Sequence, residues 1–274
     1  MRLGTSSPLT HPSPKDWANT QKALGMRAVV FPVQSDEPKE KIDAYKEAAD
    51  EAGLMIAEVG IWRNPVSSNP DERKRNIDYC GNQLKLADYL GARFAVNLAG
   101  TTGPIWDGAY KENFSKEMRK EIVKTTQEII DRAEVKNSFF TLEHMPWMVP
   151  TGPEDYLRLI DEVNRDRFGV HKDIINMINS IDRYFNANEF IAKCANLLGD
   201  RIRSCHIKDV HLSEAFTVRL EECGPGDGEF PLRYYAEKMH EIDKDMPIIL
   251  EHLNTDEEYL TYMKYLKEEL NGLY

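Results

Sequence analysis

The sequence has 274 residues, which suffices for one α/β barrel of roughly 250 residues or for two small domains. Its 35 basic and 46 acidic side chains give a net charge of -11, and this sign argues against binding to nucleic acid or to anionic membranes. The N-terminal segment lacks the pattern of a signal peptide, and no apolar run approaches 18 residues. We therefore expect a soluble, cytoplasmic protein that acts on a small molecule.

Short apolar segments recur along the chain, and a charged stretch with helical periodicity separates most of them. In chain order they are MRLGTSS, MRAVVFPV, LMIAEVGIW, RFAVNLAG, SFFTLEHMP, FGVHKD, IRSCHIKDV and PIILEHL. Eight alternations of strand and helix are typical of a parallel α/β fold, and no linker rich in Pro, Gly or Ser divides the chain. The sequence predicts a single (β/α)8 barrel over residues 1–274, with a doubly wound α/β sheet as the alternative.

The intervening stretches have the signals of amphipathic helices. In PKEKIDAYKEAADEAG, Ile42, Tyr45 and Ala49 fall on one helical face, and Gly53 supplies a C-terminal stop. SKEMRKEIVKTTQEIIDRAEV is a second helix of this kind, and NANEFIAKCANLLG is the candidate helix after Asp173.

Four of the predicted strands end in a residue that can bind a divalent metal. These residues are Glu143, Asp173, His206 and Glu251, at intervals of 30, 33 and 45 residues. Active sites of (β/α)8 barrels lie at the C-terminal ends of the strands, so the four should converge. Each could instead form an ordinary salt bridge, but three converging carboxylates repel one another, and a bound cation is the natural compensation. The ligand set suits Mn²⁺, Mg²⁺ or Co²⁺.

Two of these ligands can also act as an acid and a base. Glu143 and Glu251 come from the fifth and eighth strands, so they could flank a substrate from two sides. One glutamate would remove a proton next to a carbonyl to give a metal-bound enediolate, and the other would return a proton. The product is an epimer, or an isomer with its carbonyl moved to the next carbon.

Further side chains beside the strand ends are candidates for substrate binding. They are Glu58, Asn97 and Lys208, for sugar oxygens, and Trp62 and Trp147, as apolar walls for a sugar ring. Salt bridges and loop packing are the alternatives for this group.

Alternation along the strands predicts the direction of several neighbouring side chains. His144, Lys172 and Cys205 should face away from the barrel axis, whereas His171 should point inward one layer below Asp173. The four cysteines have no paired spacing, so we expect reduced thiols. The segment CGPGDGEFP lacks the phosphate-loop patterns and is interpreted as a tight loop before a helix.

The motifs TLEHMPW, HKDIIN, CHIKD and ILEHL together resemble those of the xylose isomerase-like TIM-barrel superfamily. The similarity runs over essentially the whole chain and is strongest to the sugar phosphate isomerase/epimerase branch, with its ketose 3-epimerases. The resemblance implies one divalent metal at Glu143, Asp173, His206 and Glu251. It implies Mn²⁺ as the ion, with Mg²⁺, Co²⁺ or Zn²⁺ as alternatives, and the two glutamates as acid and base.

Two positions depart from the ketose 3-epimerase pattern. Asn176 stands where those enzymes place a histidine, and Arg219 is the nearest arginine downstream of His206. Both are carried as candidate substrate-binding residues, and the departures leave the identity of the sugar and its phosphorylation open.

The sequence bears on other functions within and outside this superfamily. The endonuclease IV group needs more histidines than this chain offers, since Asn97 and Asn176 occupy two of the expected positions. A metal-dependent dehydratase of an inosose or sugar acid is the enzymatic alternative. A barrel that binds a sugar without turnover is the non-enzymatic one. We expect a carbohydrate substrate and no nucleic-acid or membrane partner, and the chain could form a homo-oligomer.

Overall fold

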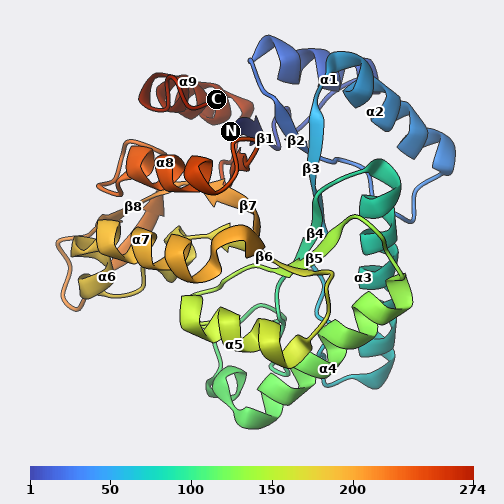
Figure 1. Ribbon diagram of the computed structural model, residues 1–274, viewed down its shortest axis with the longest axis vertical. Helices are drawn as coiled ribbons and strands as arrows, with labels where there is room; N and C mark the ends of the chain where they lie inside the picture. Colours follow the sequence, from blue (N-terminus) through green and yellow to red (C-terminus); the bar gives the residue numbers. More distant parts are fainter.

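Eight parallel strands close into a barrel in the computed structural model, which describes all residues from 1 to 274 (Figure 1). Neighbouring strands follow the order β1-β10-β7-β6-β5-β4-β3-β2. The barrel strands are β1 (Arg2–Thr5), β2 (Ala28–Val30), β3 (Met55–Gly60), β4 (Phe94–Asn97), β5 (Phe139–Leu142), β6 (Phe168–Asp173), β7 (Ile202–Ile207) and β10 (Pro247–Leu250). The predicted (β/α)8 barrel and its eight strands are confirmed.

A helix follows each barrel strand and packs around the outside of the barrel (Figure 1). These helices are α1 (Pro14–Ala23), α2 (Lys39–Ala52), α3 (Pro70–Leu90), α4 (Lys116–Ala133), α5 (Pro153–Val163), α7 (Ala187–Leu198), α8 (Leu232–Ile242) and α9 (Asp256–Glu269). Shorter elements are α6 (Ile181–Phe185) and the 3₁₀ turns η1 (Lys111–Phe114), η2 (Ile175–Met177) and η3 (Gly199–Arg201). None of the helices is long and apolar enough to cross a membrane.

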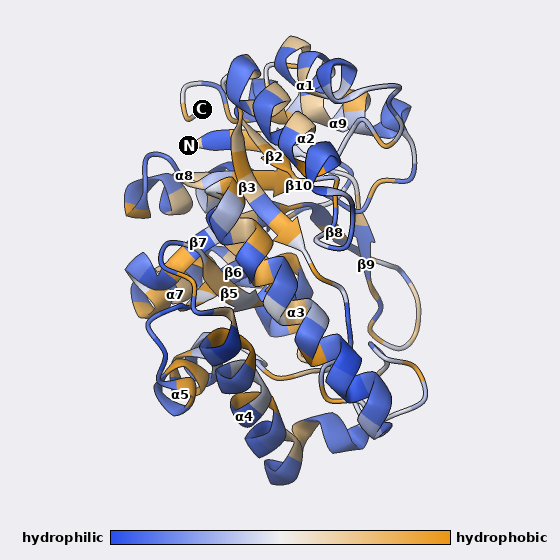
Figure 2. Ribbon diagram, turned by 90° about the vertical axis from the view of Figure 1, so that its right-hand side faces the viewer, coloured by the Kyte–Doolittle hydropathy of each residue, from blue (hydrophilic) through white to orange (hydrophobic).

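Helix α2 has the buried face and the C-terminal glycine that its sequence predicted. Helix α2 buries Ile42, Tyr45 and Ala49 and ends at Gly53, whose φ of 72° is a left-handed conformation that glycine adopts at little cost. Figure 2 shows orange, apolar strands enclosed by helices whose outer faces are blue and hydrophilic. The main hydrophobic core lies between the strands and these helices.

A smaller core fills the inside of the barrel. Its members are Ala28, Ala57, Phe94, Val96 and Ile249, all without exposed surface. The barrel interior is therefore packed with side chains in this layer, as is typical of the fold, and it is not a channel.

An antiparallel hairpin, which the sequence analysis did not predict, extends from the seventh strand. It consists of β8 (Asp209–Leu212) and β9 (Leu220–Cys223). The carboxylate of Asp209 accepts hydrogen bonds from the backbone N–H groups of Val210, Gly226, Gly228 and Phe230 at 2.8 to 3.3 Å. One side chain thus ties the hairpin to the glycine-rich loop that precedes α8.

The four cysteines are free thiols, as expected. Cys80, Cys194 and Cys205 are buried, whereas Cys223 at the end of β9 is partly exposed.

Candidate metal centre

The register of the barrel strands brings the four predicted ligands together at one end of the barrel. Asp173 on β6 lies directly opposite His206 on β7. Glu143 and Glu251 are the first residues after β5 and β10, so they leave the barrel at the same C-terminal end. One possible ligand atom from each of the four residues lies within 4.8 Å of every other. All four are buried or nearly so.

His206 lies at the centre of this cluster. Its Nδ1 is 2.7 Å from Oε2 of Glu251 and 3.3 Å from Oε1 of Glu143. Its Nε2 points across the barrel and lies 3.0 Å from Oε2 of Glu58. The two ring nitrogens therefore face two different groups of carboxylates.

Lys208, two residues beyond His206, points to the same side, as alternation predicted. Its Nζ lies 2.7 Å from Oδ2 of Asp173 and 2.7 Å from Oε1 of Glu251. The same nitrogen is 3.2 Å from Oε2 of Glu222 on the hairpin. The lysine side chain is only 1% exposed, so these carboxylates stabilise a cation that water hardly reaches.

The charges in the cluster shift the protonation of its members in opposite directions. Burial, together with the charge of Glu251, raises the pKa of Glu143 to about 8. Burial alone would raise the pKa of Glu251 as well, but His206 and Lys208 outweigh it and hold that pKa well below its usual range. Burial would lower the pKa of His206, but Glu251 and Glu58 raise it well above its ordinary value. Two glutamates a few ångströms apart therefore differ in charge at neutral pH.

The donor set fits a divalent cation. Three carboxylates and one imidazole are the hard-to-borderline ligands that Mg²⁺ and Mn²⁺ accept. Oδ2 of Asp173 is buried and accepts no hydrogen bond of good geometry, although Nζ of Lys208 lies 2.7 Å away. An oxygen in this state is available to a metal ion, so residues Glu143, Asp173, His206 and Glu251 could hold one.

Asn176 supports the ligands from the η2 turn. Its Nδ2 lies 3.5 Å from Oε1 of Glu143, and its backbone N–H donates to Oδ1 of Asp173 at 3.2 Å. The side chain is 9% exposed and lies at the edge of the cluster, where it contacts the ligand Glu143.

The residues predicted to face away from the axis do so. The ring of His144 packs on Tyr156 of α5, with centroids 4.9 Å apart. Nζ of Lys172 lies over the ring of Phe190 on α7. Buried Cys205 donates to the carbonyl of Pro247 rather than reaching the cluster. These three predictions are confirmed.

The inward direction predicted for His171 is also confirmed. Its ring lies below that of His206, with centroids 4.0 Å apart and planes at 73°. Nδ1 of His171 contacts the hydroxyl of Ser204 at 2.7 Å, and Phe94 stacks on its other side.

Asn97 and Arg219 do not join the cluster. The amide of Asn97 accepts from the backbone N–H of Arg63 at 3.0 Å and donates to its carbonyl at 2.9 Å, so it holds the loop after β3. Its Nδ2 also lies 3.6 Å from Sγ of Cys80 on α3, on the outer side of the barrel. Arg219 directly precedes β9, and its side chain is 65% exposed and pairs with Glu221. These contacts place neither side chain in the cluster, and a role of either in substrate binding stays a prediction.

Trp62 and Trp147 lie in loops at the C-terminal ends of β3 and β5, and each is 37% exposed. The indole N–H of Trp147 donates to the carbonyl of Asp107 at 2.7 Å. Trp62 has a φ of 54°, a left-handed conformation that is strained for a bulky residue and tends to occur at functional sites.

Glu222 and His252 were missed by the sequence analysis. Nδ1 of His252 lies 2.9 Å from Glu222 and 3.1 Å from Nζ of Lys208, so both residues border the cluster. His252 also has a positive φ, at 59°. The motif ILEHL contains this histidine, but nothing in the motif indicates the left-handed backbone at His252 or its contacts with Glu222 and Lys208.

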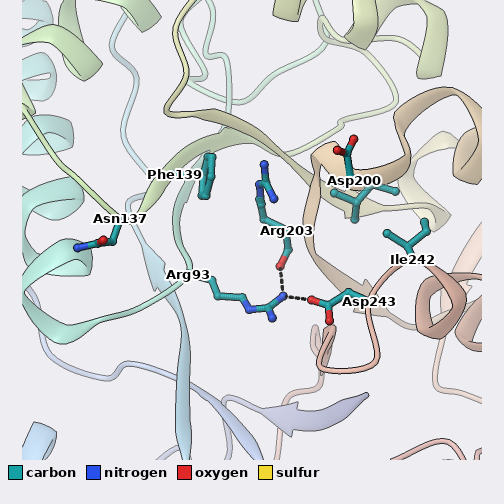
Figure 3. Close-up of a pocket in the computed structure, with 8 residues that line it drawn as sticks. Arg93, Asn137, Phe139, Asp200, Arg203, Ile242 and Asp243 are labelled. Atoms are coloured by element: carbon teal, nitrogen blue, oxygen red, sulfur yellow. Dashed lines mark hydrogen bonds and ion pairs between the residues drawn. The ribbon is translucent and has the colours of Figure 1, made fainter.

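A cavity of about 330 Å³ opens at the opposite end of the barrel, where strands β4, β5, β7 and β10 begin (Figure 3). Arg93 donates to the carboxylate of Asp243 at 2.6 Å. Figure 3 draws this hydrogen bond and a second one from Arg93 to the carbonyl of Arg203. None of the metal-ligand candidates lines this cavity.

Known proteins share this architecture. The chain superposes on a D-tagatose 3-epimerase-like protein with 21% identity and a TM-score of 0.74, over 100% of this chain and 98% of the other. It superposes on D-psicose 3-epimerase from Clostridium cellulolyticum H10, solved with D-tagatose, with 15% identity and a TM-score of 0.71, over 98% and 99%. A probable 3-DHS dehydratase from Bacillus anthracis matches with 16% identity and a TM-score of 0.71, over 97% and 99%.

No curated protein matches the sequence. Residues 19–269 match the family model of the xylose isomerase-like TIM barrel, which spans most of the chain. Together with the closed barrel, this match shows that the chain belongs to the xylose isomerase-like TIM barrel family.

Proposed function

We propose that the protein is a divalent-metal-dependent isomerase or epimerase of a sugar or sugar phosphate. The observation that carries this proposal is the convergence of Glu143, Asp173, His206 and Glu251 at the C-terminal end of the barrel. The epimerases among the similar structures have the same fold, and at identities of 21% and 15% they support the reaction class only by analogy.

The donor set suits Mn²⁺, with Mg²⁺, Co²⁺ or Zn²⁺ as alternatives. A bound ion would polarise a substrate carbonyl and acidify the C–H bond beside it. The remaining chemistry belongs to the side chains of this protein.

Glu251 and Glu143 are suited to move protons in opposite directions. Glu251 is held as a carboxylate by His206 and Lys208, so it can accept the proton from the carbon next to the carbonyl. Glu143 contacts the same Nδ1, at 3.3 Å, and in the metal-free protein its pKa is raised to about 8. Of the two carboxyl groups it is therefore the better suited to carry a proton back to the substrate. Delivery to the opposite face of the same carbon gives an epimer, and delivery to the neighbouring carbon gives an isomer.

Lys208 and Trp147 complete a binding site for a polar substrate. The ammonium of Lys208 lies between Asp173 and Glu251, where it can donate to a substrate oxygen. The partly exposed Trp147, after β5, offers an apolar face for a sugar ring.

A dehydratase of an inosose or sugar acid is the second candidate, because one structure with this fold is a probable dehydratase. It would begin with the same proton abstraction and would then expel a hydroxyl group. A barrel that only binds a sugar is the candidate of a different class.

Deuterium exchange separates these functions. Purified protein is analysed for metal, loaded with Mn²⁺, and incubated in D₂O with a panel of ketoses, sugar phosphates and sugar acids. Deuterium at a carbon next to a carbonyl, in a substrate whose carbon skeleton and hydroxyl groups are retained, supports the isomerase or epimerase. Loss of a hydroxyl group supports the dehydratase. Tight sugar binding without exchange supports the binding protein, and no bound metal would overturn the site itself.

A further inference from the structure

Glu58 reaches the metal-ligand cluster from the far side of the barrel, although β3 is not adjacent to β7 in the sheet. Its carboxylate contacts Nε2 of His206 at 3.0 Å, and its side chain is only 3% exposed. The four-ligand group does not include Glu58. The sequence predicted that Glu58 binds a sugar hydroxyl. A buried carboxylate in contact with a histidine nitrogen indicates a different role for this residue.

An irregularity in the sheet is what points Glu58 inward. Ala28 on β2 pairs with Met55 on β3. On β2, Val30 lies two residues after Ala28, but its partner Glu58 lies three residues after Met55 on β3. The extra residue on β3 makes Ala57 and Glu58 both interior, since Ala57 belongs to the inner core and Glu58 reaches His206. Bulges of this kind re-aim side chains beside active sites.

The same device occurs upstream of His206. The pairing of β6 with β7 shifts between Val170 and His171, and beyond the shift Ser204 and His206 both contact interior residues. A shift of one residue moves a side chain to the other face of a strand. Glu58 and His206 thus meet inside the barrel because each of their strands departs from simple alternation.

The chemistry of imidazole gives this contact a consequence. A neutral imidazole carries one N–H and one lone pair, and only the nitrogen with the lone pair binds a metal. Nδ1 of His206 faces Glu143 and Glu251 in the ligand cluster, so a metal bound there would take the Nδ1 lone pair and leave the single N–H on Nε2. Glu58 is the acceptor on that side.

We propose that Glu58 is the positioning residue for His206: its carboxylate accepts the Nε2–H and leaves the Nδ1 lone pair facing the metal pocket. His171 fixes the plane of the ring from below, with centroids 4.0 Å apart, but a flipped ring would pack equally against it. Glu58 distinguishes the two orientations. This inference rests on the metal site of the proposed function and adds a residue that acts through a ligand, not on the substrate.

A second metal ion is the competing explanation. Glu58, His171 and His206 each offer an atom within 4.8 Å of the others, and Nε2 of His171 is buried without a hydrogen-bond partner. An ion there would have to share His206 through both nitrogens. The hydrogen bond to Glu58 accounts for Nε2 without that requirement.

The test uses ¹¹³Cd²⁺ as the probe on protein labelled with ¹⁵N-histidine. In the native protein, we expect one cadmium per chain, scalar coupling of ¹¹³Cd to Nδ1 of His206, and a proton on Nε2. Coupling to Nε2, or a second equivalent of cadmium, overturns the proposal whatever the variants do. The His206 signals are assigned by their loss in His206→Gln.

Two variants of Glu58 separate positioning from packing. Glu58→Leu removes the acceptor at similar volume and should lose the Nε2 proton signal and 10- to 100-fold in cadmium affinity. Glu58→Gln keeps an oxygen acceptor and should retain the Nδ1 coupling with a smaller loss. Unchanged coupling and affinity in Glu58→Leu overturn the proposal. If that variant does not fold, the native spectrum and Glu58→Gln still decide. A protonated native Nε2 together with a reduced cadmium affinity in Glu58→Gln supports the proposal, and an unprotonated native Nε2 or an unchanged affinity in Glu58→Gln overturns it.

Ser204→Ala is the matched control, because it removes a hydrogen bond to the neighbouring His171 and leaves Glu58 in place. It should leave the His206 signature unchanged. The two proposals fail separately: a native protein with the expected cadmium signature but no deuterium exchange refutes the function and leaves the role of Glu58 standing.

Discussion

Glu143 and Glu251 carry the same functional group, but their neighbours give them different charges. Glu251 contacts the two cationic side chains of His206 and Lys208, whereas the buried Glu143 has a longer contact with His206 and one with the neutral amide of Asn176. A general acid and a general base that act as a pair need such a difference in charge, because one must carry a proton while the other accepts one.

Removing either carboxylate should stop turnover without unfolding the barrel. Glu143→Gln and Glu251→Gln keep the shape of the side chain but cannot exchange a proton, so deuterium exchange should fall at least about 100-fold in each. Glu47→Gln, on the exposed face of α2, is the control and should keep full activity. Circular dichroism checks the fold, and retained exchange in either active-site variant would contradict the assigned roles.

Metal binding should release protons at neutral pH. In the metal-free protein, the pKa of Glu143 is raised to about 8 and that of His206 is raised well above its ordinary value, so both hold protons at pH 7. A cation binds the deprotonated forms, and affinity for Mn²⁺ should therefore rise as the pH increases from about 6 to 8. Calorimetry in buffers of different ionisation enthalpy measures the protons released. A heat that does not depend on the buffer would be inconsistent with these protonation states, and Glu143→Gln should release about one proton fewer.

The ligand positions could be predicted from residue type and spacing, but contacts across the barrel could not. Glu58 and His206 are 148 residues apart, and a bulge in β3 decides which way Glu58 points. Asn97 ends a strand just as the ligands do, yet its amide is used by the backbone of Arg63. Strand ends indicate where a site lies, and local irregularities decide which side chains enter it.

At the scale of elements, the eight barrel strands were predictable because each is a short apolar run. The hairpin of β8 and β9 was not. IRSCHIKDV reads as one continuous strand, whereas the structure ends β7 at Ile207 and starts β8 at Asp209. The sequence of β9, LEEC, has too few apolar residues to signal a strand. The hairpin matters because it brings Glu222 to Lys208.

Asp209 should be the anchor of this hairpin. Asp209→Ala leaves several backbone N–H groups without their acceptor, and we expect a loss of about 3 kcal/mol in the free energy of unfolding. Asp209→Asn keeps one acceptor oxygen and should lose less. Urea unfolding measures both. Glu221→Gln on the same hairpin removes only surface ion pairs, so it should change the free energy of unfolding by under about 0.5 kcal/mol. Equal losses in Asp209→Ala and Glu221→Gln would argue against Asp209 as the anchor of the hairpin.

At the scale of the whole molecule, the four ligand candidates sit on half of a closed barrel. They lie at or just after the ends of strands β5, β6, β7 and β10. These four strands are consecutive neighbours in the sheet and form one half of the barrel. The unfolded chain cannot present them together, because Glu143 and Glu251 are more than 100 residues apart in sequence.

Metal should therefore stabilise the entire fold. At a free Mn²⁺ concentration 100 times the dissociation constant, the free energy of unfolding should increase by about 2.7 kcal/mol, and a chelator should reverse the gain. Thermal or urea unfolding with and without Mn²⁺ tests this. His206→Gln is the control, and an equal response in that variant would show that the ion acts elsewhere.

The partly exposed thiol of Cys223 makes the hairpin observable without any engineered label. Burial, together with the nearby carboxylates of Asp209, Asp227 and Glu222, raises the pKa of this thiol to about 12. Alkylating reagents attack the thiolate, so Cys223 should react slowly while the hairpin is seated and faster whenever it lifts away. The three other cysteines are buried and should not be alkylated in the folded protein. The rate of alkylation, followed by mass spectrometry with and without metal or sugar, would thus report how often the mouth of the barrel opens.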